Sequence, residues 1–351
     1  MVFSHELLHW YEANGRILPW RETKDPYIIW LSEIILQQTK VVQGLPYFHQ
    51  FIKTFPTMES LAEASEEEVL KLWQGLGYYS RARNLHKTAK YIQSEYHGIF
   101  PDTYSLISKL PGIGDYTACA ILSFAFGKVY PVLDGNVGRV STRFSGIFDP
   151  IENQTTKNKI KSILQLWIDK DKPALFNQAI MDFGALVCTP GKAICLSSSL
   201  YCPFSNWCYA YKHDMVENLP VKKQSKAVKN RYLHYYMLSN KEGLLLHKRL
   251  LNDIWKGLYD FPFCETLETN IPMEKGKLSS VAENIGSVSF LKQYTHLLSH
   301  QRLHVFFYQK ELTEAQIQLW SKEYIFVPWK QIKNFAVPKV FEQFFQDFKI
   351  I

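Results

Sequence analysis

A single carboxyl group stands inside the apolar segment between residues 26 and 39. Glu33 is the only ionisable residue between Tyr27 and Thr39, and Trp30 precedes it by one helical turn. Burial disfavours the charged form of a carboxyl group, so such surroundings raise its pKa and keep a proton available near neutral pH. We therefore predict a buried helix with Glu33 as a general acid. A surface glutamate on an amphipathic helix is the alternative, which the apolar neighbours disfavour.

A second carboxyl group, Asp134, directly precedes a predicted helix start at Gly135. In isolation it could be an ordinary helix N-cap. Upstream, Gly112 and Gly114 allow a tight turn between two predicted helices, and the exposed N–H groups of such a turn, next to a helix dipole, can bind a DNA phosphate. The turn on its own is equally compatible with a simple helix connection.

Four of the six cysteines lie close together in the sequence. They are Cys188, Cys195, Cys202 and Cys208, with six, six and five residues between them. In a reducing compartment such a group indicates metal binding rather than disulfides. We expect a [4Fe–4S] cluster, since it takes four thiolates. Zinc and an empty site are the alternatives, although zinc sites usually contain two cysteines about two to four residues apart. Cys119 and Cys264 stand apart and are typical of core residues.

Residues 1–213 are predicted to be mostly helical. Ser65 and Glu68 form a capping box, which marks a helix start. Apolar residues recur at helical spacing in three further stretches, namely 79–96, 117–126 and 157–168. The two carboxyl groups and the four cysteines all belong to this region.

Beyond residue 213 the pattern changes twice. Residues 214–231 are rich in Lys and Arg, which predicts a solvated basic linker, with contact to a phosphate backbone as an alternative. Residues 232–351 are predicted to form a smaller α+β domain. Its predicted strands are 232–238, 244–247, 288–291 and 303–308, and its predicted helices are 313–320 and 337–348.

Composition restricts the class of protein. The chain has 351 residues, 46% of them hydrophobic, and a net charge of +7, which favours a polyanionic partner only weakly. The N-terminus does not resemble a signal peptide, and no apolar run approaches the roughly 20 residues that span a bilayer. We expect a cytoplasmic monomer with reduced thiols.

The two glycines and Asp134 together resemble the signature of the helix-hairpin-helix DNA glycosylase superfamily, in which the aspartate stabilises positive charge on the sugar. Within it, four motifs in order resemble the MutY family of adenine DNA glycosylases. They are LPWR at 18–21, WLSEIILQQT at 30–39, GLGYYSRARNLH at 75–86 and LDGNV at 133–137. The resemblance implies excision of adenine from mispairs with 8-oxoguanine or guanine in double-stranded DNA.

The resemblance also implies roles for individual residues. Glu33 would protonate adenine at N7, and Asp134 would stay charged beside the sugar. Asn136, in the same motif as Asp134, would belong to the catalytic residues. Glycosidic cleavage commonly uses two carboxyl groups in opposed environments. Trp20, Arg21, Leu36 and Gln178 would shape the adenine pocket, and Arg81 would contact DNA. Gln38 and Tyr78 would fill the gap left by the extruded base, although core packing is the alternative for Tyr78.

Tyr116 separates two enzyme classes. An endonuclease III-like glycosylase/lyase, the main alternative, needs a lysine just past the hairpin to form a Schiff base, and a phenol cannot replace it. The sequence therefore predicts a monofunctional enzyme in which water is the final nucleophile and Tyr116 bonds near Asp134. A DNA-binding sensor without chemistry is a further alternative, disfavoured because both carboxyl groups are present.

The cysteine spacing departs from the family pattern of six, two and five residues. LSSS at 196–199 reads as an insertion before Cys202, which alters the loop but keeps four ligands. The cluster would hold a loop with basic groups such as Lys192 and Lys212 against DNA.

The C-terminal part carries two further motifs, WKGLYDFP at 255–262 and HLLSHQ at 296–301, which resemble the Nudix-related domain of MutY proteins. In that family a Phe-Ser-His loop meets 8-oxoguanine. Here Leu298 replaces the aromatic residue, while Ser299 and His300 remain to bond the lesion. A strand-end Ser-His without a partner is the alternative. Because 257–286 lacks a helix crowded with Arg and Glu, we expect recognition rather than pyrophosphatase activity.

Overall fold

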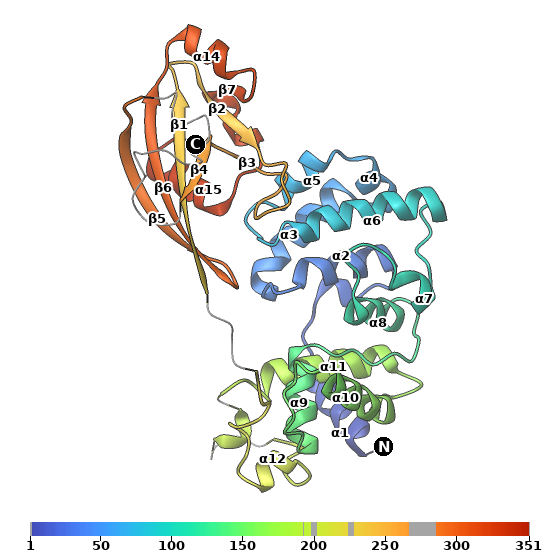
Figure 1. The fold of residues 1–351 in the computed structure, drawn as a ribbon. Helices are drawn as coiled ribbons and strands as arrows, with labels where there is room; N and C mark the ends of the chain where they lie inside the picture. Colours follow the sequence, from blue (N-terminus) through green and yellow to red (C-terminus); the bar gives the residue numbers. More distant parts are fainter. Residues whose placement is uncertain (1, 192, 198–201, 224–227, 267–285, 351) are drawn as a thin grey trace. The chain divides into compact units, whose positions relative to one another are not determined.

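In the computed structural model, which describes residues 2–191, 193–197, 202–223, 228–266 and 286–350, the chain separates into two compact units. One contains Met1–Ala62 and Lys87–Gln224, and the other contains Glu63–His86 and Ser225–Ile351. Figure 1 shows the elements of both. The second unit therefore combines the C-terminal part with a helical segment from the first quarter of the sequence.

The first unit is built from helices. They are α1 (Val2–Asn14), η1 (Pro19–Arg21), α2 (Pro26–Leu36), α3 (Val41–Thr54), α4 (Met58–Glu63), α7 (Tyr104–Ile107), α8 (Asp115–Phe124), α9 (Gly135–Ser145), α10 (Gln154–Trp167), α11 (Pro173–Leu186), η2 (Ile194–Leu196), α12 (Tyr209–Lys212) and the later turns of α6 (Ser80–Tyr96). Apolar side chains of α1, α9, α10 and α11 form a shared core around Leu7, Ile160 and Phe176. This packing fixes the backbone from which the candidate site residues project.

Local signals explain the two helices that carry the carboxyl groups. Asp25 caps α2 by accepting a hydrogen bond from the Tyr27 N–H at 2.8 Å, and Pro26 occupies the first turn, where its missing N–H costs nothing. The predicted helix over 26–39 ends early, because Gln38 adopts a left-handed backbone with φ 54°. Asp134 caps α9 by accepting from the Val137 N–H at 2.7 Å.

The second unit contains a seven-stranded sheet with the order β3-β2-β1-β6-β5, where β4 also pairs with β1 and β7 with β2. The strands are β1 (Lys229–Ser239), β2 (Gly243–Lys248), β3 (Tyr259–Asp260), β4 (Phe263–Thr266), β5 (Ser289–Leu297), β6 (Gln301–Glu311) and β7 (Ile325–Pro328). The β1–β6 pair is parallel and the other pairs are antiparallel. Helix α15 (Lys339–Asp347) buries Phe341 and Phe344 against Phe307 of β6. The remaining helical elements are α14 (Glu314–Trp320) and η3 (Trp329–Asn334).

The segment Glu63–His86 is fastened into this second unit by polar contacts. It contains α5 (Glu66–Leu72), whose capping box between Ser65 and Glu68 is present as predicted. Glu67 accepts hydrogen bonds from Tyr259 and Lys248, both at 2.6 Å. Arg83, on the first turn of α6, donates to the Lys256 carbonyl at 2.5 Å. The segment that contains the motif 75–86 therefore contacts residues of the C-terminal part of the chain.

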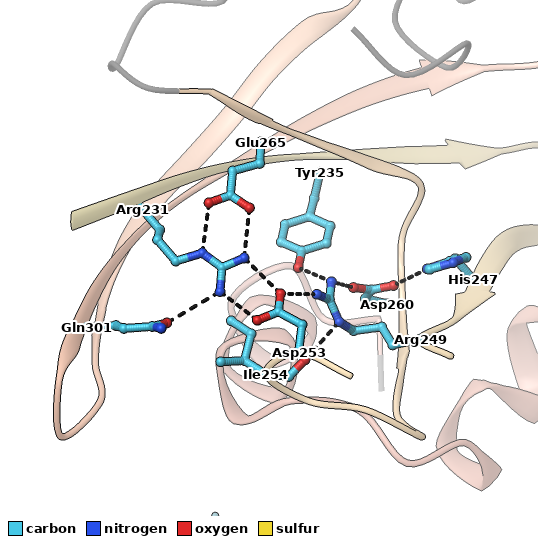
Figure 2. Close-up of polar contacts among 9 residues, drawn as sticks. All are labelled: Arg231, Tyr235, His247, Arg249, Asp253, Ile254, Asp260, Glu265 and Gln301. Atoms are coloured by element: carbon cyan, nitrogen blue, oxygen red, sulfur yellow. Dashed lines mark hydrogen bonds and ion pairs between the residues drawn. The ribbon is translucent and has the colours of Figure 1, made fainter. Parts of the chain in front are cut away.

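An ion-pair network built around the buried residues Arg231, Arg249 and Asp260 fixes one end of the sheet (Figure 2). Arg231 binds Glu265 and Asp253, and Arg249 binds Asp253 and Asp260. Asp260 is fully buried and also accepts from His247 at 2.9 Å. Arg231, expected at the end of a solvated linker, is instead 8% exposed within strand β1. Its carboxylate partners make this burial possible, because a buried charge requires pairing.

Candidate active site

The largest set of predicted site residues lines one cavity of about 730 Å³ in the first unit. Its walls include Trp20, Arg21, Glu33, Leu36, Gln38, Tyr116, Asp134, Asn136 and Gln178. These residues come from η1, α2, the turn after α2, α8, the start of α9 and α11. The fold therefore gathers side chains that are widely separated in the sequence around one space.

Glu33 is buried, with 7% of its surface exposed. Burial raises its pKa to about 7, and the negative charge of Asp134 acts in the same direction. A hydrogen bond from Tyr116 and the positive charge of Arg21 oppose this rise. A carboxyl group with this pKa is partly protonated at neutral pH and can deliver a proton to a base in the cavity.

Asp134 is held in a different way. Its carboxylate accepts from the Val137 N–H and from the Asn136 side-chain amide, the latter at 3.2 Å. Burial raises the pKa of Asp134, and these hydrogen bonds oppose the rise because they favour the charged form. Asn136 is fixed in turn by Arg139, which donates to its Oδ1 at 2.9 Å and to the Cys188 carbonyl at 2.7 Å.

Tyr116 occupies the position where a lyase would need an amine. Its hydroxyl lies 3.9 Å from the Met181 sulfur, and burial, together with the charges of the nearby Glu33 and Asp134, raises its pKa well above the usual value. We expected this hydroxyl near Asp134; Tyr116 lines the same cavity as Asp134 and Glu33, and the charges of both act on its pKa. A neutral phenol next to Glu33 can orient the acid but cannot form an imine.

Arg16 and Arg21, which both line the cavity, are held by a carboxylate that the sequence analysis missed. Asp182, on α11, is fully buried and binds both of them, with 2.8 Å to Arg16 Nε and 2.7 Å to Arg21 Nη1. Although burial alone raises its pKa, the hydrogen bonds from Arg21 and Arg16 hold the pKa of Asp182 below its usual value. Arg21 also donates to the Tyr11 hydroxyl at 3.1 Å. The signal in the sequence was a single ionisable residue within an apolar helix, which is the same pattern that indicated Glu33.

The residues expected to enter the base stack belong to different units. Gln38 lies in the first unit, lines the cavity and has a left-handed backbone. Tyr78 lies in the second unit with φ 48°, is 46% exposed, and its hydroxyl is hydrogen-bonded to Ser299. Arg81, expected to contact DNA, is instead 8% exposed and donates to the Gly77 carbonyl at 3.1 Å. It supports the Tyr78 turn from inside.

The predicted phosphate-binding turn has the expected backbone. Gly112 adopts φ 75°, which a residue with a side chain rarely adopts, and Gly114 is the N-cap of α8. Both are exposed, so the turn lies on the surface of the first unit. Asp115 follows in the first turn of α8 and is paired with Lys161 at 2.5 Å.

The four clustered cysteines line a second, small cavity of about 30 Å³ in the first unit. Phe3, Phe183 and Phe204 are among its other walls, and Arg143 Nη1 lies 3.3 Å from the Cys188 sulfur. Among the residues that the structure describes, no three metal-binding side chains are grouped as ligands of one metal ion. Four thiols that line one apolar cavity supply the donor set that a thiolate-ligated group requires. Lys192 and part of the 196–199 insertion lie outside the described residues; Lys212 ends α12.

Ser299 and His300 lie at the turn between β5 and β6 and are both exposed. The turn is closed by the Leu298 N–H, which donates to the Gln301 carbonyl at 2.8 Å. The His300 carbonyl accepts from the Lys229 N–H at 3.1 Å, which anchors the turn to β1. The two side chains predicted to read the opposite base are therefore presented on a fixed backbone.

Comparisons with known proteins match two parts of the chain to known families. Residues 31–169 match the HhH-GPD superfamily of base excision DNA repair proteins, and residues 234–347 match the NUDIX domain. The chain is 37% identical over 300 residues to the adenine DNA glycosylase of Buchnera aphidicola subsp. Acyrthosiphon pisum, covering 85% of each protein. It is 39% identical over 227 residues to the human adenine DNA glycosylase, covering 62% of this chain and 41% of that one.

Solved structures share the helical fold. A thermostable thymine-DNA glycosylase has a TM-score of 0.55 and 29% identity, covering 60% of this chain and 96% of that one. Endonuclease III in a non-covalent DNA complex has a TM-score of 0.52 and 21% identity, covering 61% and 95%. No helix among the described residues is long and apolar enough to cross a membrane.

Proposed function

The chain belongs to the adenine DNA glycosylase family, and from this premise we propose that it hydrolyses the N-glycosidic bond of adenine paired with 8-oxoguanine or guanine. It is a DNA glycosylase of base excision repair with the helix-hairpin-helix fold and a Nudix-like C-terminal domain. The observation that carries the proposal is the shared cavity of Glu33, Tyr116 and Asp134. It contains Glu33, with a pKa of about 7, and Asp134, whose pKa burial also raises while its hydrogen bonds favour the charged form.

In the proposed reaction Glu33 donates its proton to N7 of the extruded adenine. The bond between N9 and C1′ then breaks, and its electron pair leaves with the neutral base. Asp134 stabilises the positive charge that develops on the sugar, which is the role an ionised carboxylate can perform at short range. Water adds to C1′, and the proton that it loses returns to the Glu33 carboxylate.

The backbone turn at Gly112 and Gly114 is proposed to bind a phosphate of the same DNA. Ser299 and His300 are proposed to contact the base opposite adenine, and Gln38 and Tyr78 to fill the stack that adenine leaves. We place the reaction in the first unit and lesion recognition in the Nudix-like domain after residue 231.

We also propose that Cys188, Cys195, Cys202 and Cys208 hold a [4Fe–4S] cluster. The apolar walls of the cavity and the approach of Arg143 to the Cys188 sulfur suit a thiolate-ligated group. Such a cluster would fix the loop that follows α11. Purified protein should be yellow-brown with about four iron atoms per chain. A colourless, active protein that contains zinc would reject this assignment.

The function is tested with duplexes that contain 8-oxoguanine:A, G:A or T:A at one fixed salt concentration, since backbone contacts make DNA affinity salt-dependent. We expect alkali-labile sites at adenine in the first two duplexes and not in the third. The strand should stay intact before alkali, because Tyr116 supplies no amine. Efficient borohydride trapping of the protein on DNA would instead support the endonuclease III-like lyase.

A further inference from the structure

We propose that Tyr11 is a positioning residue that sets the orientation of the Gln178 amide and so determines which purine the cavity accepts. The inference rests on the proposed function, because it concerns the same cavity. The four residues involved are Asp182, Arg21, Tyr11 and Gln178, which form one continuous chain of hydrogen bonds within the first unit.

The chain starts from a fixed point. Asp182 is fully buried, and its two oxygens bind Nη1 and Nη2 of Arg21 at 2.7 and 2.9 Å. The paired bonds hold the guanidinium in one plane, as is usual for Arg bound by a carboxylate. The Arg21 side chain is only 11% exposed. Its position is therefore set by the protein core and not by solvent.

The direction of each bond follows from the donor inventory. A guanidinium can only donate, so the Tyr11 oxygen must accept from Arg21 Nη1 at 3.1 Å. The single hydroxyl hydrogen of Tyr11 is donated to the Gln178 Oε1 at 3.3 Å. Partial burial raises the pKa of Tyr11, so the hydroxyl keeps this hydrogen near neutral pH. In this arrangement the oxygen of the Gln178 amide faces Tyr11, and its nitrogen faces away.

This fixes what Gln178 offers to a bound base. The amide keeps one lone pair on Oε1 and the hydrogens on Nε2 for a ligand in the cavity that it lines. Adenine carries an amino donor at position 6 next to the ring acceptor N1, on the edge away from the N7 that Glu33 protonates, and this pair matches one acceptor beside one donor. Hypoxanthine carries a carbonyl acceptor at position 6 next to an N–H donor at N1, so it requires the opposite amide orientation. A free amide could turn over and accept both bases, whereas the held one discriminates between them.

The variant that isolates this effect is Tyr11→Phe, which keeps the ring and removes only the hydroxyl. Single-turnover excision is measured from duplexes with adenine or hypoxanthine opposite 8-oxoguanine. We expect the adenine-to-hypoxanthine rate ratio to fall by about tenfold, which corresponds to the loss of one oriented polar contact. Tyr91→Phe, at an exposed tyrosine on α6, is the matched control and should keep the wild-type ratio.

The same Tyr11→Phe substitution in a Gln178→Glu protein separates an effect on the orientation of the Gln178 amide from a general loss of packing. A carboxylate presents two equivalent acceptors, so Gln178→Glu removes the difference between the two amide orientations. In this background Tyr11→Phe should leave the ratio unchanged, although both proteins can have altered absolute rates. Thermal unfolding of every variant accompanies the kinetics and registers any structural loss.

The outcomes distinguish the inference from the function on which it rests. If wild-type protein excises adenine but Tyr11→Phe keeps the wild-type ratio, the positioning role is wrong and the proposed function stands. If Tyr11→Phe lowers the ratio equally in the Gln178→Glu background, the effect does not pass through Gln178 and the inference is again wrong. If wild-type protein excises neither base, the proposed function itself fails.

Discussion

At the scale of single residues, the site depends on two carboxyl groups whose surroundings differ. Glu33 lies inside α2 with its pKa raised to about 7 by burial, while Asp134 accepts hydrogen bonds from Val137 and Asn136. This difference divides their labour, because the first can give a proton and the second can remain charged. Each role can be tested on its own.

Glu33→Gln should reduce single-turnover excision nearly to background. The amide keeps the shape of the side chain but has no acidic proton to give, and general acid catalysis typically contributes about 10²–10⁴-fold. Binding of an 8-oxoguanine:A duplex should stay close to wild type. Glu12→Gln, at an exposed position of α1, is the matched control. Robust excision by the Glu33→Gln variant would remove this carboxyl group from the mechanism.

The excision rate should also depend on pH, falling on both the alkaline and the acid side of an optimum. The raised pKa of Glu33 means that its protonated fraction falls as pH rises through about 7, so excision should slow above that value. On the acid side the rate should fall as Asp134 takes up a proton. Asn136→Ala removes a hydrogen bond to the charged form of Asp134, which raises the pKa of that group and should move the acid limb to higher pH. An acid limb that stays in place would show that Asp134 does not control it.

At the scale of secondary-structure elements, the second unit depends on the ion-pair network at the end of its sheet. Arg249 is 5% exposed and lies 2.8 Å from Asp260, which is fully buried. Arg249→Met leaves this carboxylate in the core without its cation, so the free energy of unfolding should fall by about 3–5 kcal/mol. Lys248→Met, at a half-exposed pair with Glu67, should cost less than about 1 kcal/mol. Urea unfolding measures the free energy of unfolding of both variants. Equal losses would contradict the claim that the buried ion pair contributes more than the half-exposed one.

Much of this architecture could be predicted from the sequence because its signals are local. The capping box at Ser65, the apolar spacing of α6 and α10, and the charged residue inside α2 each lie within one or two helical turns. Such patterns report on their own element, which is why the helices and the environment of Glu33 were predicted.

What escaped prediction depends on contacts between distant parts of the chain. Asp182 stands in an apolar helix as Glu33 does, but its partner Arg21 is 161 residues away, and no spacing rule joins them. In the sequence Arg231 stands at the end of a basic segment typical of a linker, whereas in the structure it binds Glu265 and Asp253. The packing of Glu63–His86 with the C-terminal part is of the same kind. These pairings exist only once the chain has folded.

At the scale of the whole molecule, discrimination between adenine opposite a lesion and adenine opposite guanine requires a contact with the base opposite adenine, which the chemistry of Glu33 does not provide. Adenine is a normal base, so the information must come from its partner. The exposed turn of Ser299 and His300 is suited to this task, and the hydroxyl of Ser299 is hydrogen-bonded to that of Tyr78 in the same unit. A base that binds Ser299 would compete for this hydroxyl and so affect the residue expected to enter the stack.

The Ser299→Ala, His300→Ala double variant should therefore lose much of its preference for 8-oxoguanine:A over G:A. A lost hydrogen bond to a base edge typically removes about 1–3 kcal/mol of discrimination. The chemical step on a bound G:A duplex should change less, because Glu33 and Asp134 are untouched. Ser321→Ala, in the same unit but at the end of α14, is a control that should keep the wild-type ratio. If the double variant also keeps that ratio, the opposite base is read by the helical unit, and the Nudix-like domain has another role.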